Sequence, residues 1–226
     1  MASPSITTDT ALLRLLQLCS PALPVGAYAF SQGLEAAMDL QWLRNQQQIE
    51  SWLSLQLQHS VAQVELPLLL RLHHAWATAD HERVLYCNAL LLACRETEEL
   101  RLSDTAMGSA MARLLPTLEL TLPCTVEPPL FLTLFSFAAQ RWQLSAELAA
   151  LGYAWTWLEN QVIAATKLLP LGQSQAQQLL SSLQQQVPAL IEQARQLDDD
   201  DIGSSLPGLA FASMHHETQY TRLFRS

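Results

Sequence analysis

Three neighbouring residues near the C-terminus, His215, His216 and Glu217, carry side chains that serve both as metal ligands and as acid–base groups. We expect this segment to be extended. Adjacent side chains would then point to opposite sides, and the two histidines would not chelate one ion. No third ligand stands nearby in the sequence. We therefore predict no metal site and no catalytic residue here, and favour a structural or interface role over a transient metal contact.

A second pair of histidines, His73 and His74, falls in an apparent helix, where adjacent side chains diverge by roughly 100°. This spacing favours a solvated helix face over a site. The four cysteines form no CxxC pair, so free and mostly buried thiols are expected rather than a catalytic thiol. They are Cys19, Cys87, Cys94 and Cys124.

The sequence contains no GxxxxGK[ST] motif, so the chain has no P-loop with which to hydrolyse a nucleoside triphosphate. It could still act on a partner's active site, because an arginine inserted there stabilises a phosphoryl-transfer transition state. Arg222 and Arg225 are the candidates for this role. Arginines that pair with carboxylates at an interface are more common, so a trans-acting arginine is the second interpretation.

The overall charge excludes several classes of partner. The chain of 226 residues has a formal net charge of −9, which disfavours electrostatic binding to nucleic acid or to a membrane. The longest apolar run, near residues 129–139, is too short to span a bilayer. No basic region precedes the first apolar run, as a secretory signal would require. We expect a cytoplasmic protein that needs no cofactor.

The stretch 145–169 is expected to form the central helix of the fold. Its leucines, one valine and Trp155 recur at helical spacing among small residues, which is typical of a helix buried nearly all round. Pro170 ends this helix, and Gly172 suits a left-handed closing residue. Residues 174–177 resemble a capping box that starts the next helix, which we expect to bend at Pro188.

Helix-forming residues dominate the rest of the chain, and alternating runs are short. We expect helix starts at Asn45 and Asp80, and close packing of a neighbour against Gly108. The acidic run 198–201 is expected to be solvated. The fold class is therefore all-α: a single-domain helical bundle around a central apolar helix, with an extended C-terminal tail.

Two segments do not fit a simple bundle. Residues 20–35, the apolar loop, contain two prolines and two glycines among apolar residues without helical or strand period. Residues 202–226, the tail, gather aromatic residues and arginines, which dominate the energetics of interfaces. We predict an all-helical domain over 1–201, and a flexible linker and partner-binding tail over 202–226. We also predict that tail and apolar loop pack together.

Four ordered motifs connect this chain to a known family. They are SPALPVGAYAFSQGLE over 20–35, Glu-Thr at 96–97 followed by Gly108, PLGQ over 170–173, and HETQYTRLFRS over 216–226. Together they resemble the urease accessory protein F (UreF) family across essentially the whole chain. The chain departs from that pattern at Ala176, where many members have glycine, and at His215, which makes a double histidine.

The resemblance implies a non-catalytic urease maturation factor that is all-helical and dimerises. Such a protein binds the accessory scaffold UreD/UreH and recruits the GTPase UreG for nickel insertion into apo-urease. The partners implied are therefore UreD/UreH, UreG, apo-urease and a second copy of the chain. A regulator of the UreG GTPase cycle acting in trans is the alternative, and a small helical enzyme using His216 and Glu217 is a third reading.

The motifs also assign residues to two groups. The residues expected to bind partners lie in the apolar loop and the tail: Tyr28, Ser31, Glu35, His216, Glu217, Gln219, Tyr220, Arg222, Leu223, Phe224, Arg225 and Ser226. The residues expected to shape the backbone are prolines, glycines and one glutamine at turns and close contacts: Pro21, Pro24, Gly26, Gly33, Gly108, Pro170, Gly172 and Gln173.

Overall fold

The computed structural model describes residues 9–225 of the chain, and within that range it contains helices and no β-strand. The predicted all-α class is confirmed. The α-helices are α1 (Asp9–Leu18), α2 (Leu34–Asp39), α3 (Gln46–Gln56), α4 (Leu66–Thr78), α5 (His81–Ala93), α6 (Glu98–Leu114), α7 (Phe131–Arg141), α8 (Ala146–Leu168), α9 (Gln173–Gln184), α10 (Val187–Gln196) and α11 (Pro207–Glu217).

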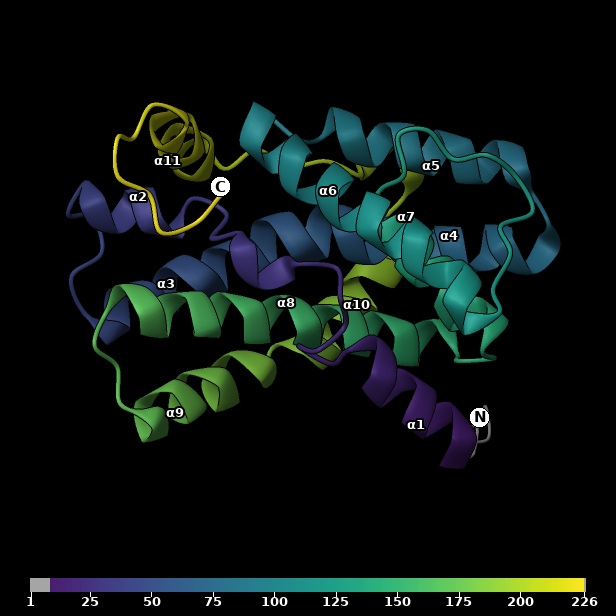
Figure 1. Cartoon of the computed structure of the whole chain (residues 1–226), viewed down its shortest axis with the longest axis horizontal. Helices are drawn as coiled ribbons and strands as arrows, with labels where there is room; N and C mark the ends of the chain where they lie inside the picture. Colours follow the sequence, from purple (N-terminus) through teal and green to yellow (C-terminus); the bar gives the residue numbers. More distant parts are fainter. Residues whose placement is uncertain (1–8, 226) are drawn as a thin grey trace.

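The predicted central helix is α8, which runs through the middle of the molecule with α4 to α7 on one side and α9 and α1 on the other (Figure 1). It begins where Ser145 Oγ accepts a hydrogen bond from the backbone N–H of Leu148, at 3.1 Å. Small residues such as Ala150 and Ala154 are fully buried, which lets the neighbouring helices pack closely around it.

The predicted helix starts at Asn45 and Asp80 are confirmed. Asn45 accepts from the N–H of Gln48 at the start of α3, and Asp80 accepts from the N–H of Arg83 at the start of α5, both at 3.0 Å. Between α3 and α4 the chain remains helical but widens into a π-helix, Leu57–Glu65. This widened segment was not predicted.

Close packing at Gly108 is also confirmed. A Cβ at this position would lie 2.0 Å from the carbonyl oxygen of Pro129, so only glycine allows the chain before α7 to cross α6 here. Pro21 and Pro24 lie exposed in the apolar loop, and Gly26 precedes a short 3₁₀ turn, Ala27–Ala29, with φ of 77°.

Several details of the second half differ from expectation. After Pro170, helix α9 begins at Gln173 rather than within 174–177. Gly172 has an extended backbone with φ of −65°, so it is not a left-handed closing residue; it precedes α9, and its N–H donates to the side chain of Gln175 at 2.9 Å. The expected single bent helix is two helices, α9 and α10. Pro188 lies in the first turn of α10, where its missing N–H costs no hydrogen bond, and therefore starts a helix instead of bending one.

The tail also differs from expectation, since residues 207–217 are helical rather than extended. Pro207 stands in the first turn of α11, as is common for a helix start. Figure 1 shows α11 beside α2 and α6, with the last described residues close to both. Its sequence, PGLAFASMHHE, buries Leu209, Ala212, Ser213 and His216 on one face.

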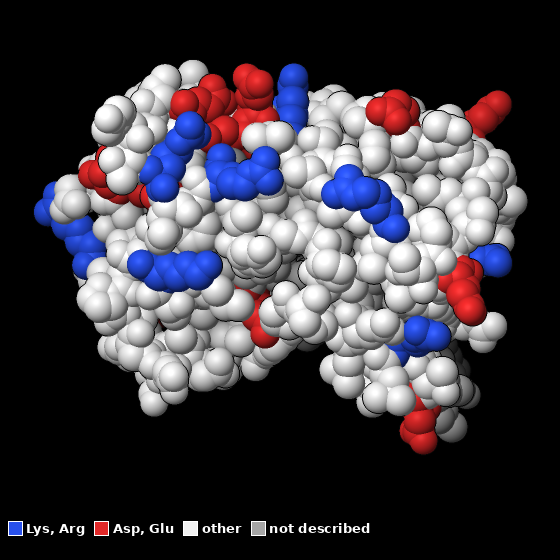
Figure 2. All heavy atoms as spheres, viewed as in Figure 1, with Lys and Arg blue, Asp and Glu red and all other residues white. Residues whose placement is uncertain are grey.

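The acidic run is not purely solvated. Asp199 forms ion pairs with Arg71 of α4 and Arg83 of α5, and these hold the pKa of that carboxyl below its ordinary value. No helix in residues 9–225 is long and apolar enough to cross a bilayer. Figure 2 shows Lys, Arg, Asp and Glu side chains gathered over the end of the molecule that holds α2 and α11, whereas the side formed by α9 is nearly free of charge in this view.

Candidate partner-binding site

Helix α11 is fixed to the body by small residues and one polar contact. Gly33, with φ of 80°, would place a Cβ only 3.0 Å from Cδ1 of Leu209, so glycine permits both the turn into α2 and the close approach of α11. On the α6 side, the hydroxyl oxygens of Thr97 and Ser213 are 2.7 Å apart. The same Thr97 hydroxyl accepts the N–H of Leu100 and starts α6.

The outer side of α11 carries an aromatic stack. The rings of Phe211 and Trp42 are 5.8 Å apart and nearly parallel, and Trp42 in turn lies 6.3 Å from Trp52 of α3. The stack joins the helix of the tail to the segment between α2 and α3. A change in the position of α11 would alter the surroundings of both tryptophans.

Beneath α11 lies a buried cluster of two carboxylates and one imidazole, here called the Glu–His–Glu cluster: Glu35 of α2, His216 of α11 and Glu99 of α6. The Nε2 atom of His216 is 3.0 Å from Glu35, and its Nδ1 atom is 2.9 Å from the nearer oxygen of Glu99. His216 is 0% exposed. The predicted interface histidine is therefore an internal anchor.

Glu35 also receives the backbone of the tail. Its two oxygens accept hydrogen bonds from the N–H groups of Leu223 and Phe224, at 2.7 and 2.9 Å. Charge-assisted bonds of this kind are stronger than neutral ones. One carboxylate thus holds both the helix of the tail and the segment beyond it.

Glu99 sits in a comparable position on α6. Burial raises the pKa of Glu99 above its ordinary value, while the hydrogen bond to His216 and the charges of His216 and Arg222 act in the opposite direction. A guanidinium nitrogen of Arg222 lies 3.3 Å from Glu99. Arg222 is consequently tied to the body on one side while its side chain stays partly exposed.

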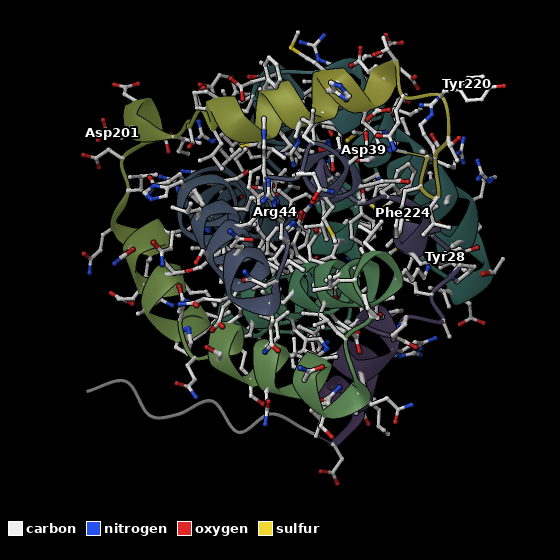
Figure 3. All side chains as sticks on the ribbon, turned by 90° about the vertical axis from the view of Figure 1, so that its left-hand side faces the viewer. Tyr28, Asp39, Arg44, Asp201, Tyr220 and Phe224 are labelled. Carbon is white, nitrogen blue, oxygen red and sulfur yellow. The ribbon has the colours of Figure 1, made fainter. Side chains whose placement is uncertain are left out.

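The predicted packing of tail against apolar loop is confirmed for the described residues. The N–H of Arg225 donates to the carbonyl of Ala29 at 2.8 Å, and its guanidinium lies 5.9 Å from the ring centre of Phe30. Lys167 of α8 lies between the rings of Tyr28 and Phe224, 5.8 and 5.3 Å from their centres. Figure 3 shows Phe224 turned toward the body on the side where Tyr28 lies.

Side chains of α8 hold the apolar loop in place. Gln32, with a left-handed φ of 50°, accepts hydrogen bonds from the indole N–H of Trp157 at 2.8 Å and from the side chain of Gln161 at 3.3 Å, both on α8. Ser31 is fully buried beside it. These contacts fix the loop in the orientation that receives the tail.

The expected partner-binding residues divide into two sets. Tyr28, Tyr220 and Leu223 point outward and are 62%, 103% and 61% exposed, and Figure 3 shows Tyr220 projecting away from the protein. The residues that also lie at the surface, at least in part, are Glu217, Gln219, Arg222 and Arg225. The residues that face inward are Ser31, Glu35, His216 and Phe224. Ser226 lies outside the described residues.

The other candidate residues are not part of this site. His74 is exposed, as expected for a solvated face, whereas His73 is half-buried and its Nε2 contacts the carbonyl oxygen of Leu144 at 2.8 Å, so His73 anchors a turn. All four cysteines are free, and burial raises the pKa of Cys19 to about 11, so this thiol is not activated. Among residues 9–225 no group of three or more His, Cys, Asp or Glu side chains could hold a metal ion.

The comparisons with known proteins agree with the motifs. The UreF family model matches residues 43–184. A urease accessory protein UreF of Marinomonas sp. is 51% identical over 222 residues, covering 98% of this chain and 96% of the relative. A UreF of Psychrobacter cryohalolentis is 46% identical, with 97% and 96% covered, and one of Pseudoalteromonas translucida is 45% identical, with 99% and 97% covered.

The chain belongs to the UreF family. Membership supports a role in urease maturation, and the names of the relatives describe accessory proteins rather than enzymes. The UreF assignment spans both the helical body and the tail, since the relatives cover nearly the whole chain.

Several residues of the site were not expected from the sequence. Glu99, Lys167 and Gln32 were not among the residues expected to bind partners. Their roles depend on which helices lie side by side. A glutamate that faces the buried side of a helix is the one signal that would have indicated Glu99.

Proposed function

We propose that this chain is a non-catalytic maturation factor, a chaperone of urease that binds the scaffold UreD/UreH and recruits the GTPase UreG for nickel insertion into apo-urease. Family membership supports the urease maturation part of this proposal. One observation carries the finer part: Tyr28, Tyr220 and Leu223 are exposed on a surface that is hydrogen-bonded to the body, with Arg222 and Arg225 beside them.

This composition is that of a binding surface. Aromatic residues and arginines contribute most to interface energies. The described end of this chain is hydrogen-bonded to Glu35 and Ala29, yet it leaves large apolar side chains in solvent. We call the exposed residues Tyr28, Tyr220, Arg222, Leu223 and Arg225 the partner surface.

The proposal includes further features that accompany this role. The chain acts as a homodimer in the cytoplasm, uses no cofactor and binds neither nucleic acid nor membrane. Its net charge of −9 favours basic or metal-handling partners over nucleic acid. The buried residues Ser31, Glu35, His216 and Phe224 serve the partner surface indirectly, by holding the tail in place.

The test compares two matched double variants in binding to purified UreD/UreH. Tyr220→Ser with Leu223→Ser removes apolar area from the partner surface without touching the body. We expect binding to weaken at least tenfold, because each side chain is a large exposed apolar group. The control is Tyr86→Ser with Leu85→Ser on α5, where the same two residue types are also exposed, to 52% and 44%.

Two results decide this test. Normal binding by the Tyr220 and Leu223 variant would contradict the proposal, as would equal losses in the two double variants. Arg222→Ala gives an independent check: complexes with UreD/UreH and UreG should be lost while the circular dichroism spectrum and the melting temperature of the body stay close to the original. Full assembly with that variant would remove Arg222 from the partner surface.

A second candidate function is regulation of the UreG GTPase in trans. Arg222 is paired with Glu99, whereas the Arg225 side chain is exposed and its guanidinium lies 5.9 Å from the ring centre of Phe30. Arg225 is therefore the arginine that could reach a partner's active site. GTP turnover by UreG in the complete complex should fall at least tenfold with Arg225→Ala, and unchanged turnover would rule this candidate out.

A further inference from the structure

The Glu–His–Glu cluster places a hydrogen-bond acceptor at each nitrogen of one imidazole ring. His216 Nε2 faces Glu35 at 3.0 Å, and Nδ1 faces both oxygens of Glu99 at 2.9 and 3.0 Å. A neutral imidazole carries one N–H and one lone pair. If the ring were neutral and both carboxylates ionised, one carboxylate would face a lone pair at hydrogen-bond distance.

The geometry therefore requires one more proton than a neutral ring with two ionised carboxylates provides. The proton resides either on the ring, making it an imidazolium, or on one of the two carboxyl groups. In both cases two N···O contacts are each bridged by a hydrogen. Burial of all three side chains makes the alternative costly, because no water replaces a missing hydrogen bond there.

The charged groups around the ring come from α2, α6, α11 and the segment beyond it. Glu35 faces it from α2 and Glu99 from α6, Glu217 follows it on α11, and Arg222 approaches Glu99 from the tail. Among these four groups three carboxylates are acidic and one, Arg222, is a cation that pairs with Glu99.

The same cluster holds the described end of the tail. Glu35 binds His216 of α11 and the N–H groups of Leu223 and Phe224, so the position of the partner surface depends on where this carboxylate points. Loss of the proton would place two acceptors against each other at this point. Release of the tail relieves that contact by giving Glu35 and Glu99 back to water.

We propose that Glu35, His216 and Glu99 form a proton-dependent latch that keeps the tail docked on the body and so holds the partner surface in place. The part concerning the partner surface rests on the proposed function. The latch closes when the extra proton is bound and opens as pH rises. His216 and Glu99 are positioning residues in this scheme, since both are buried below the exposed side chains.

The experiment follows backbone hydrogen exchange in the isolated full-length chain from about pH 6 to about pH 8.5, around the range where imidazoles exchange protons. Rates are divided by the intrinsic rates at each pH. Exchange of one proton shifts the docking equilibrium by up to about tenfold per pH unit. We expect protection of the Leu223, Phe224 and Arg225 amides to fall at least tenfold across this range, while amides of α8 keep theirs.

The decisive variant is Glu99→Gln. An amide can donate to the lone pair of a neutral imidazole, so the cluster is satisfied without the extra proton. Protection of the tail should then change less than about twofold over the same pH range. Arg222→Gln is the control for the lost Arg222 contact: it should lower protection of the tail but keep the pH dependence of the original chain.

Each outcome bears on the latch. A pH-independent tail in the original chain would overturn it, and so would a pH dependence in Glu99→Gln equal to the original one. Binding to UreD/UreH then tests the link to the partner surface. The affinity of Glu99→Gln relative to the original chain should rise between pH 6 and pH 8.5, and a constant ratio would overturn that link alone.

Failure of the latch and failure of the proposed function are distinguishable. Hydrogen exchange is measured on the chain without partners, so it tests the latch whatever the partners are. The Tyr220 and Leu223 double variant leaves the latch intact and tests the partner surface by itself.

Discussion

Two buried charged clusters in this protein differ in what holds them together. In the body, Arg95 pairs with Glu65 at 2.9 Å and with Asp104 at 2.5 Å, joining the π-helix to α6. In the tail, His216 occupies the equivalent place between Glu35 and Glu99. The first cluster is centred on a permanent charge and the second on a group that can lose its proton.

The surroundings strengthen this difference. Burial acts against the charge of Arg95, but the attraction of Asp104 and Glu65 holds its pKa well above the ordinary value. The charged groups of the Arg95 cluster reach water only if the helical body opens. Those of the Glu–His–Glu cluster reach water when the tail alone is released. We infer that the helical body keeps its structure as pH changes, whereas the docking of the tail depends on pH.

The largest effect should come from the body cluster. Arg95→Met leaves Glu65 and Asp104 buried without their cation, which costs about 3 to 5 kcal/mol of unfolding free energy. Urea denaturation followed by circular dichroism measures this loss. Arg113→Met, exposed on the same helix α6, is the control and should change stability by less than about 0.5 kcal/mol. Equal effects would contradict the distinction.

A smaller loss is expected where α6 meets the chain before α7. Gly108→Ala would place a Cβ against the backbone of Pro129 and Leu130. Because backbone atoms cannot move aside easily, we expect a loss of about 3 kcal/mol of unfolding free energy, the upper end of the usual range for overpacking. Gly208→Ala in α11 is the control, because its Cβ would lie 3.7 Å from Trp52 in ordinary contact. A stable Gly108→Ala would show that this crossing is loosely packed.

The tail cluster should respond differently to the loss of its central group. His216→Leu leaves two buried carboxylates, but release of the tail limits the loss of body stability to about 1 to 2 kcal/mol. Trypsin should then cleave after Arg222 at least ten times faster. His215→Leu is the matched control on the same helix. Slow cleavage in His216→Leu would show that the tail is held mainly by other contacts.

The smallest effect concerns an exposed cluster. Asp199 pairs with Arg71 and Arg83, and its pKa lies below the ordinary 3.8, so its contribution is present above that pH and is lost as pH falls through the lowered value. Solvent screening limits it to less than about 1 kcal/mol. Thermal melts of Asp199→Asn at neutral and acidic pH should show this loss at neutral pH only, with Asp200→Asn as control.

The helical body was largely predictable because its signals are local. Ser145, Asn45 and Asp80 start helices through their own side chains, and the spacing of apolar residues in α8 indicates a buried helix whatever surrounds it. The π-helix and the break between α9 and α10 depend on packing across helices. Those features therefore did not follow from the sequence.

The site was predictable in its location but not in its construction. The unusual composition of the apolar loop and the tail indicated both segments, and Arg225 and Ala29 do join them. The roles of Glu99 and His216 depend on α2, α6 and α11 meeting below the surface, and no periodicity in one segment reports on such a meeting. From its residue type, His216 was predicted to lie at an interface with a partner, whereas its side chain is fully buried in this chain.

Reconstitution of urease tests the central claim most directly. Apo-urease, nickel, UreD/UreH, UreG and GTP are combined with the original chain, with the Tyr220→Ser and Leu223→Ser variant, with the Tyr86→Ser and Leu85→Ser control, or with no chain, and urease activity is measured. We predict activation only with the original chain and the control. Equal activation by the Tyr220 and Leu223 variant, or full activation without any chain, would contradict the account.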